Sequence, residues 1–291
     1  MSSSYLIVGA KKRSECVFKE GEYESKMEHT LMETNGFIAA LDQSGGSTPA
    51  ALERYGYERH LCEDPEQMFN LVHDYRTRII KSRAFAKEYV CGAILFENTL
   101  DRNIDGMSTT DFLWKVKGIV PFLKCDQGLL PEKDGVRLMN PMTRLDEVLD
   151  KGVTHGVFGT KMRSLINANN TEGIKNIVDQ QFEYAEKIIM RGLCPIIEPE
   201  VNIHAKDKHE IESTLLTCIL QKLDLLKGDK KVMLKLTLPE STDLYRQLID
   251  HPRVLMVVAL SGGYSMEEAN ERLSEQRGMS ASFSRALVEG L

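Results

Sequence analysis

Short runs of apolar residues alternate with longer segments of mixed polarity from Gly36 to near the end of the chain. A short continuous apolar run is typical of a strand buried on both faces of a parallel sheet, and apolar residues three and four apart are typical of a helix packed against it. The expected strands span residues 36–42, 90–97, 120–124, 155–163, 193–200, 231–238, 253–261 and 279–285. Eight strands alternating with helices predict an α/β fold, a single (β/α)8 TIM barrel.

The segments between these runs carry helix boundary signals. Thr48-Pro49 and Asp64-Pro65 each place a proline at the first position of a helix, and Ser265 with Glu268 forms a capping box. The expected helices begin at residue 48 and span residues 64–80, 108–117, 143–151, 171–191, 207–228, 242–249 and 265–278. A doubly wound open sheet is the alternative, but the first turn has no G-x-G-x-x-G motif and the chain has no Walker A motif.

The two ends of the chain depart from this alternation. Residues 1–26 show no clear period, so we expect an N-terminal extension outside the fold, followed by the barrel over residues 27–291. Only residues 286–291 follow Arg285, which is under two turns of helix. We therefore expect a truncated eighth helix and an incompletely covered apolar face near Phe283.

The run 231–238 contains a lysine at its centre. Alternate side chains of a strand share a face, so one face carries Val232, Leu234 and Leu236 and the other carries Met233, Lys235 and Thr237. Loss of hydration favours the neutral amine of such a lysine, and a neutral amine is a nucleophile toward a ketone. The alternative is a strand-end lysine whose ammonium group reaches solvent, and this strand alone leaves both interpretations open.

Polar or charged residues recur where the expected strands end. They are Asp42, Lys124, Lys161, Arg163, Glu198, Glu200, Lys235, Ser261 and Arg285. In a barrel the catalytic groups lie at the carboxyl ends of the strands. Lys161 and Lys235 follow the fourth and sixth strands, so we expect their ammonium groups to approach each other, while Asp42 and Glu198 supply carboxylates for proton transfer. This combination suits an amine nucleophile with acid and base partners.

Two Ser-Gly-Gly turns, at residues 44–46 and 261–263, form a second signal. Glycine lets backbone N–H groups approach an anion closely, and the serine hydroxyl adds a donor. The alternative is a pair of tight turns that require positive φ. Two such turns at one end of the barrel, with Lys124, Arg163 and Arg285 available, predict two phosphate sites and a small bisphosphate ligand.

Composition narrows the class of protein. A net charge of −6 argues against a nucleic-acid binder, and no apolar run approaches the roughly 20 residues of a membrane span. The N-terminus has no signal-peptide core, and the six cysteines are scattered without a C-x-x-C motif. We therefore expect free thiols in a reducing compartment, and hence a cytoplasmic protein. Its partners are expected to be small molecules rather than nucleic acid or membrane.

Residues 36–287 resemble the class I (Schiff-base) fructose-bisphosphate aldolases, most closely the shorter bacterial type. The resemblance rests on FIAALDQSGGSTP at 37–49, GAILFE at 92–97, GIVPFLK at 118–124, FGTKMR at 158–163, PIIEPEVN at 195–202, VMLKLT at 232–237, LSGGY at 260–264 and ASFSRAL at 281–287. It implies a glycolytic lyase that cleaves fructose 1,6-bisphosphate, needs no metal or cofactor, binds sugar phosphates and forms a homo-oligomer, a dimer or a tetramer.

The resemblance also implies roles for individual residues. Lys235 would form the Schiff base, Glu198 would act as acid and base in carbinolamine dehydration, Asp42 would take the C4-hydroxyl proton, and Lys161 would stabilise charge on the intermediates. The implied phosphate ligands are Ser261, Gly262 and Arg285 on the C1 side and Ser44, Ser47, Lys124 and Arg163 on the C6 side, with Ser284 as a further substrate-binding residue. A mobile C-terminal tail is also implied beyond the eighth helix, so we expect this chain to turn over slowly.

Three other functions are weighed against this one. A metal-dependent aldolase would need a cluster such as His204, Asp207 and His209, but these histidines are five residues apart with no third one close in sequence. A Schiff-base aldolase for another sugar phosphate would not need the second set of phosphate ligands. A catalytically weak barrel acting as a binding scaffold would not need all the chemical residues that are present.

Overall fold

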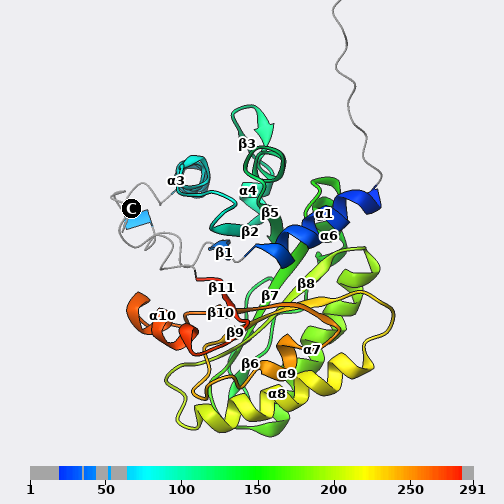
Figure 1. The fold of residues 1–291 in the computed structure, drawn as a ribbon, viewed down its shortest axis with the longest axis vertical. Helices are drawn as coiled ribbons and strands as arrows, with labels where there is room; N and C mark the ends of the chain where they lie inside the picture. The colour runs from blue at the N-terminus through cyan, green and yellow to red at the C-terminus, as the bar shows by residue number, and fades with distance from the viewer. Residues whose placement is uncertain (1–19, 35, 44–51, 54–63, 284–291) are drawn as a thin grey trace, which may run out of the picture.

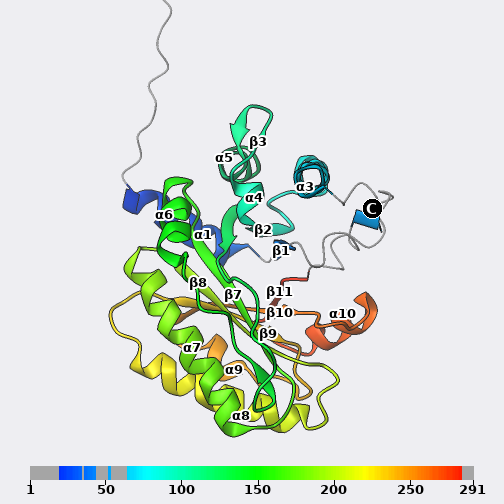
Figure 2. The ribbon, with the colours of Figure 1, turned by 180° about the vertical axis from the view of Figure 1, so that it is seen from behind.

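Eight parallel strands form the centre of the molecule in a computed structural model that describes residues 20–34, 36–43, 52–53 and 64–283. They are β1 (Phe37–Leu41), β2 (Val90–Leu95), β5 (Val120–Lys124), β7 (Gly159–Ile166), β8 (Cys194–Val201), β9 (Val232–Thr237), β10 (Val254–Leu260) and β11 (Ser280–Ala281). Each pairs with the next in that order, and Ser280 Oγ donates a 2.7 Å hydrogen bond to Gly36 O where β11 comes round to β1 (Figures 1 and 2). The expected eight-stranded α/β barrel is confirmed.

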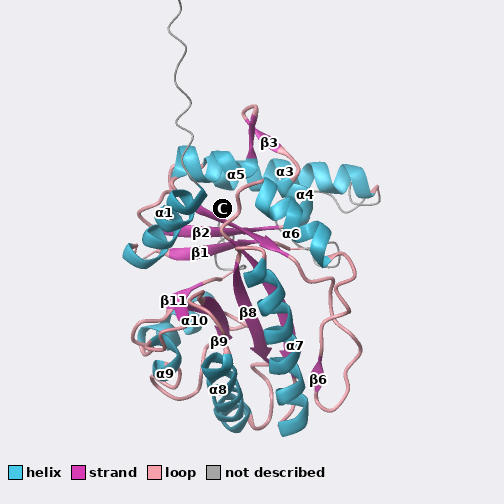
Figure 3. Ribbon diagram, turned by 90° about the vertical axis from the view of Figure 1, so that its right-hand side faces the viewer, coloured by secondary structure: helices cyan, strands magenta, loops and turns pink. Residues whose placement is uncertain are grey.

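Helices cover the outside of this sheet (Figure 3). They are α3 (Pro65–Lys81), α4 (Glu97–Leu100), α5 (Thr109–Asp111), the π-helix η2 (Phe112–Lys117), α6 (Leu145–Thr154), α7 (Thr171–Met190), α8 (Lys208–Leu225), α9 (Arg246–Ile249) and α10 (Met266–Ser274). The carboxylate of Asp64 accepts the N–H groups of Glu66 and Gln67, and Ser265 Oγ accepts that of Glu268, as the boundary signals predict.

Two local features differ from the expectation. The fourth strand begins at Gly159 rather than residue 155, because α6 continues to Thr154 and Gly156 then turns the chain at φ 66°. A Cβ atom on Gly159 would lie 1.9 Å from Cys194 O, so only glycine allows β7 to start this close to β8. The segment expected as one helix at 108–117 divides into α5 and the π-helix η2.

Two short pairings were also not expected. β3 (Asn103–Ile104) and β4 (Met107–Ser108) form an antiparallel hairpin, the protrusion at the top of Figure 1. β6 (Val136–Arg137) pairs antiparallel with the end of β7, which extends that strand to Ile166.

A helix that the sequence did not predict closes the amino end of the barrel. α1 (Glu20–Glu33) places Met27 and Leu31, each 2% exposed, against the inward-facing apolar side chains of the strands. These strand residues are Ile38, Cys91, Ile94, Val120, Phe122, Phe158, Ile196, Met233 and Val258. The expected extension is therefore corrected in part, since residues 20–26 belong to this helix, whereas residues 1–19 lie outside the described residues.

An apolar pocket of about 350 Å³ lies outside the barrel, between β1, β11, α3 and α10. Phe37, Met266 and Phe283 are among its lining residues, and none of the candidate catalytic residues lines it. The expected truncated eighth helix would begin beyond Phe283, at residues that lie outside the described part of the chain, so that expectation stays a prediction. Among the helices that the structure describes, none is long and apolar enough to cross a membrane.

Candidate active site

The barrel interior changes from apolar to charged along the strands. In β9, Val232, Leu234 and Leu236 face the outer core, whereas Met233 belongs to the apolar interior cluster, so the two-face assignment is confirmed. Lys235 lies two residues beyond Met233 on the same inner face. Its side chain is 5% exposed, so the ammonium group is held inside the barrel and does not reach solvent.

Four charged side chains from four strands form a continuous chain of ion pairs. Lys235 Nζ lies 3.2 Å from Glu198 Oε1, and Glu198 Oε2 lies 2.8 Å from Lys161 Nζ. Lys161 Nζ lies in turn 2.7 Å from Asp42 Oδ2, at the end of β1. The two lysines share Glu198, which agrees with the expected approach of their ammonium groups. All four side chains are less than a tenth exposed.

Mutual attraction keeps Asp42, Glu198 and Lys161 ionised. Burial alone raises the pKa of Asp42 and of Glu198, but the ammonium groups of Lys161 and Lys235 outweigh burial and hold both pKa values below the ordinary range. Burial lowers the pKa of Lys161, but Asp42 and Glu198 outweigh it and raise that pKa above its ordinary value. Lys161 therefore remains a cation between two carboxylates at neutral pH.

Strands β8 and β9 pair as far as Ile197 and Leu234, just before Glu198 and Lys235. Beyond that point the N–H of Glu198 donates to Gln181 Oε1 on α7 at 2.9 Å, and Gln181 Nε2 donates to Ser164 Oγ at 3.0 Å. Gln181 was not predicted from the sequence, because the tertiary structure decides which polar residues of an amphipathic helix turn inward, where a buried amide needs partners.

A second buried polar group ties down the chain after β9. Lys208 on α8 pairs with Glu212 and donates to Leu238 O at 2.8 Å, and the N–H of Glu240 donates to Glu212 Oε2 at 3.0 Å. Both charged side chains are at most 1% exposed. They fix the backbone just after Lys235. Their i, i+4 spacing on a helix did not lead to a prediction of this buried pair from the sequence.

Two further ion pairs lie nearer the solvent. Lys124 Nζ is 2.6 Å from Asp126 Oδ1, and Arg163 Nε is 2.5 Å from Glu200 Oε2. Asp126 was also missed, since it lies in a loop without a motif. Both cations already have a carboxylate partner, so an anionic ligand would share or displace that partner.

The second Ser-Gly-Gly turn follows β10 with both glycines at positive φ, 60° for Gly262 and 124° for Gly263. This geometry agrees with the need for glycine and leaves the anion-binding role of Ser261 a prediction. Four other expected substrate-binding residues lie outside the described part of the chain: Ser44, Ser47, Ser284 and Arg285.

The possible metal ligands are dispersed. His204 is exposed, and His209 Nδ1 lies 3.1 Å from Ser241 Oγ. Within the described ranges, no group of three or more His, Cys, Asp or Glu side chains could hold a metal ion.

Comparisons with known proteins agree with this geometry. The family model for fructose-bisphosphate aldolase class-I matches residues 26–242. Fructose-bisphosphate aldolase class 1 of Clostridium acetobutylicum is 55% identical over 261 residues, covering 90% of this chain and 88% of that protein. The protein of the same name from Synechocystis sp. is 56% identical over 256 residues, covering 88% and 85%.

A solved structure supports the fold. Fructose-bisphosphate aldolase from Plasmodium falciparum, in a ternary complex with TRAP and a small-molecule inhibitor, superposes with a TM-score of 0.73 at 21% identity. The match covers 92% of this chain and 84% of that one. With the family model and the two relatives in agreement, this chain belongs to the class I fructose-bisphosphate aldolase family.

Proposed function

We propose that this chain catalyses the reversible aldol cleavage of fructose 1,6-bisphosphate to dihydroxyacetone phosphate and glyceraldehyde 3-phosphate through a Schiff base on Lys235. The observation that carries the proposal is the buried sequence of amine, carboxylate, amine and carboxylate formed by Lys235, Glu198, Lys161 and Asp42. Membership in the family supports the same activity.

The first half of the reaction joins the enzyme to the substrate. Glu198 Oε1, 3.2 Å from Lys235 Nζ, accepts a proton from the ammonium group, and the free amine attacks the C2 carbonyl. Glu198 then returns a proton to the C2 hydroxyl of the carbinolamine, which leaves as water. The product is a protonated imine that carries the positive charge needed for cleavage.

The second half breaks the C3–C4 bond. Asp42 takes the proton of the C4 hydroxyl, the O–H electron pair forms the C4 carbonyl, and the C3–C4 pair moves into the imine to give a neutral enamine. Glyceraldehyde 3-phosphate departs, the proton taken by Asp42 is returned to C3 to restore the protonated imine, and water hydrolyses that imine to release dihydroxyacetone phosphate and the Lys235 amine. Lys161, held between Asp42 and Glu198, stabilises the negative charge that develops on the reacting oxygens.

The cations nearer the solvent are assigned to binding the two phosphate groups of the substrate. Lys124 and Arg163 lie on β5 and β7 and would bind the C6 phosphate with Ser44 and Ser47. The turn of Ser261 and Gly262 after β10 would bind the C1 phosphate with Arg285, and Ser284 would add a further contact to the substrate.

The deciding test is borohydride reduction in the presence of dihydroxyacetone phosphate, followed by peptide mapping. An adduct on Lys235 is expected, and the absence of any adduct would favour the scaffold function.

The ratio of kcat/KM for fructose 1,6-bisphosphate to that for fructose 1-phosphate tests the second phosphate site. A ratio near one would favour a Schiff-base aldolase for another sugar phosphate.

We also propose a homo-oligomer, a dimer or a tetramer, that works in the cytoplasm. The resemblance to the family supports the assembly. The free thiols of Cys91, Cys125, Cys194 and Cys218 are consistent with a reducing compartment. Light scattering after gel filtration gives the mass, and a value of one chain would refute the assembly.

A further inference from the structure

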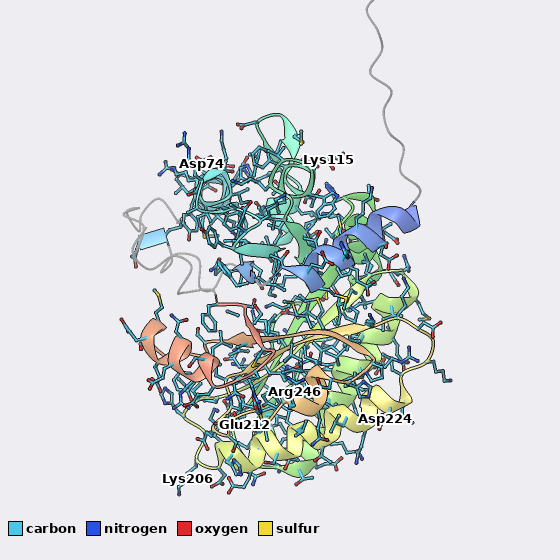
Figure 4. The ribbon with its side chains drawn as sticks, viewed as in Figure 1. Asp74, Lys115, Lys206, Glu212, Asp224 and Arg246 are labelled. Atoms are coloured by element: carbon cyan, nitrogen blue, oxygen red, sulfur yellow. The ribbon has the colours of Figure 1, made fainter. Side chains whose placement is uncertain are left out.

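A buried arginine outside the four-residue ion-pair chain lies close to Asp42. Arg76 is on α3 and is 1% exposed, whereas Asp74 on the same helix faces solvent (Figure 4). An arginine taken out of water loses its hydration and normally keeps a carboxylate partner. Within the described ranges Arg76 forms no such ion pair, and its Nε atom has no hydrogen-bond acceptor.

Its two bonds go to neutral oxygens that belong to different elements. Nη1 donates to Thr99 Oγ1 on α4 at 2.5 Å, and Nη2 donates to the carbonyl oxygen of Gln43 at 2.7 Å. Gln43 directly follows Asp42, so this fork ties the backbone at the carboxyl end of β1 to α4. A planar guanidinium can span two acceptors in this way, which a lysine ammonium cannot reproduce.

Charge adds to this geometry. Burial lowers the pKa of Arg76 to about 10, while attraction to Asp42 opposes that shift, so the guanidinium stays protonated at neutral pH. The other charged groups that act on Asp42 lie on four strands: Lys124 on β5, Lys161 on β7, Glu198 on β8 and Lys235 on β9. The attraction between Arg76 and Asp42 comes from the helix layer, since Arg76 lies on α3.

We propose that Arg76 is a positioning residue for Asp42, which holds the end of β1 and adds positive charge behind the carboxylate that takes the C4-hydroxyl proton. This inference rests on the proposed function. It predicts that Arg76 matters for breaking the C3–C4 bond and not for attaching the substrate, because the Schiff base forms on the other side of Glu198, at Lys235.

The test measures cleavage of the C3–C4 bond and attachment of the substrate separately in the variant Arg76→Met. We expect kcat for cleavage of fructose 1,6-bisphosphate to fall about 10- to 100-fold, the scale of a catalytic group displaced by about 1 Å. Borohydride trapping with dihydroxyacetone phosphate should stay within about twofold of wild type. The acid limb of kcat/KM should move to higher pH, because loss of a nearby cation raises the pKa of a carboxyl group.

Matched variants decide between positioning and general destabilisation. Arg78→Met removes the same charge from the exposed side of α3 and should change neither reaction nor the pH profile. Arg76→Lys keeps the charge without the fork, so cleavage should recover in part and the acid limb should return. If Arg76→Met does not fold, Thr99→Val removes one acceptor and should show a smaller loss of cleavage with normal trapping.

Three outcomes are distinguishable. Equal loss of trapping and cleavage in the Arg76 and Thr99 variants would reduce Arg76 to a structural residue and overturn the inference. Unchanged cleavage in both variants would also overturn it. Absence of trapping in the wild type would instead refute the proposed function, independently of Arg76.

Discussion

Lys235 is held in place by its strand on both sides. Met233 lies in the apolar floor beneath it, and Thr237 beyond it exchanges hydrogen bonds with the backbone of Val201 at 2.8 and 2.9 Å. Glu198 is the only acidic side chain paired with its ammonium group among the described residues. The amine is therefore held in one orientation and has one carboxylate that can accept its proton. This is the arrangement that a Schiff-base nucleophile needs.

Lys235→Met should abolish cleavage and keep the fold. Methionine preserves much of the apolar stem but has no amine, so no Schiff base can form. The measurements are the cleavage rate and the circular dichroism spectrum, with Lys230→Met as a control because Lys230 is half-exposed at the other end of the strand. Cleavage within about tenfold of wild type would remove Lys235 from the mechanism.

Lys161→Met should change the pH dependence of both stability and activity. In the wild type the pKa values of Asp42 and Glu198 are lowered, so their stabilising contribution is complete above the ordinary carboxyl pKa, about 4, and is lost as the pH falls through the lowered values. Without the ammonium group of Lys161, both carboxyl groups should protonate at higher pH.

The expected loss of stability in this variant is about 3–5 kcal/mol, since a buried charge is left without its partner. Urea unfolding between pH 5 and pH 8 measures it, and the acid limb of kcat/KM should move to higher pH. Lys187→Met, which removes an exposed i, i+4 pair with Glu183, is the control. An unshifted acid limb would contradict the electrostatic role given to Lys161.

At the residue scale, the candidate site residues that could be named from the sequence are those that interrupt apolar strands. Lys235, Glu198 and Lys161 are such residues, because a charge between buried neighbours has few explanations. Arg76 and Gln181 could not be found with equal ease. They lie on amphipathic helices, where polar residues are common and only the tertiary structure tells which of them turn inward.

At the scale of elements, α1 shows that a helix can close one end of a barrel without a strong sequence signal. Of the α1 side chains that the structure describes, in residues 24–33, Met27 and Leu31 are buried in the interior, and most of the remaining helix is polar. Two ion pairs, Lys230 with Glu24 and Lys231 with Glu28, bring its other face to the segment before β9. Such a helix needs the apolar interior of the barrel to pack against. The sequence pattern does not show where in space that interior lies.

Leu31→Ala should destabilise the protein by about 2–5 kcal/mol, the usual range for removing a buried leucine side chain. The matched control is Met32→Ala on the next residue, whose side chain is 61% exposed, and it should have little effect. Chemical denaturation of both variants gives the comparison. Equal small losses would show that α1 does not cap the barrel in solution.

Gln181→Leu should weaken the junction between α7 and β8. It leaves the N–H of Glu198 and the hydroxyl of Ser164 without their buried partner, at about 1–3 kcal/mol for each group. Cleavage should also slow, because the backbone of Glu198 loses its tether. Glu186→Leu places the same residue on the exposed side of α7 and is the control, and identical melting temperatures for the two variants would refute the tether.

Boundaries were harder to predict than elements. The starts of α3, α7 and α10 follow their capping residues closely, since a side-chain cap is a local signal. The start of β7 depends on the contact of Gly159 with Cys194, and the length of β7 depends on pairing with β6, both of which are long-range. Local patterns therefore predicted the eight strands of the barrel and most of the described helices but not α1, β3, β4 or β6, and tertiary contacts decided where several elements begin and end.

At the scale of the whole molecule, the barrel separates stability from chemistry along its axis. Apolar side chains and α1 fill the amino end, and paired charges fill the carboxyl end. Among the described residues, the ion pairs at this end join four acidic side chains to four basic ones: Asp42, Asp126, Glu198 and Glu200 with Lys124, Lys161, Arg163 and Lys235. A bisphosphate adds negative charge at this end, and binding should therefore weaken as salt screens the cations.

The proposed chemistry supplies its own electron sink, and the last prediction follows from this. The protonated imine formed with Lys235 accepts the electron pair of the C3–C4 bond, which is the task of the metal ion in Lewis-acid catalysis. Dialysis against EDTA should therefore leave kcat/KM for fructose 1,6-bisphosphate unchanged, whereas borohydride with dihydroxyacetone phosphate should inactivate the enzyme. Activity that is lost on chelation and restored by Zn²⁺ would instead assign the carbanion to a metal, and Lys235 would then need another role.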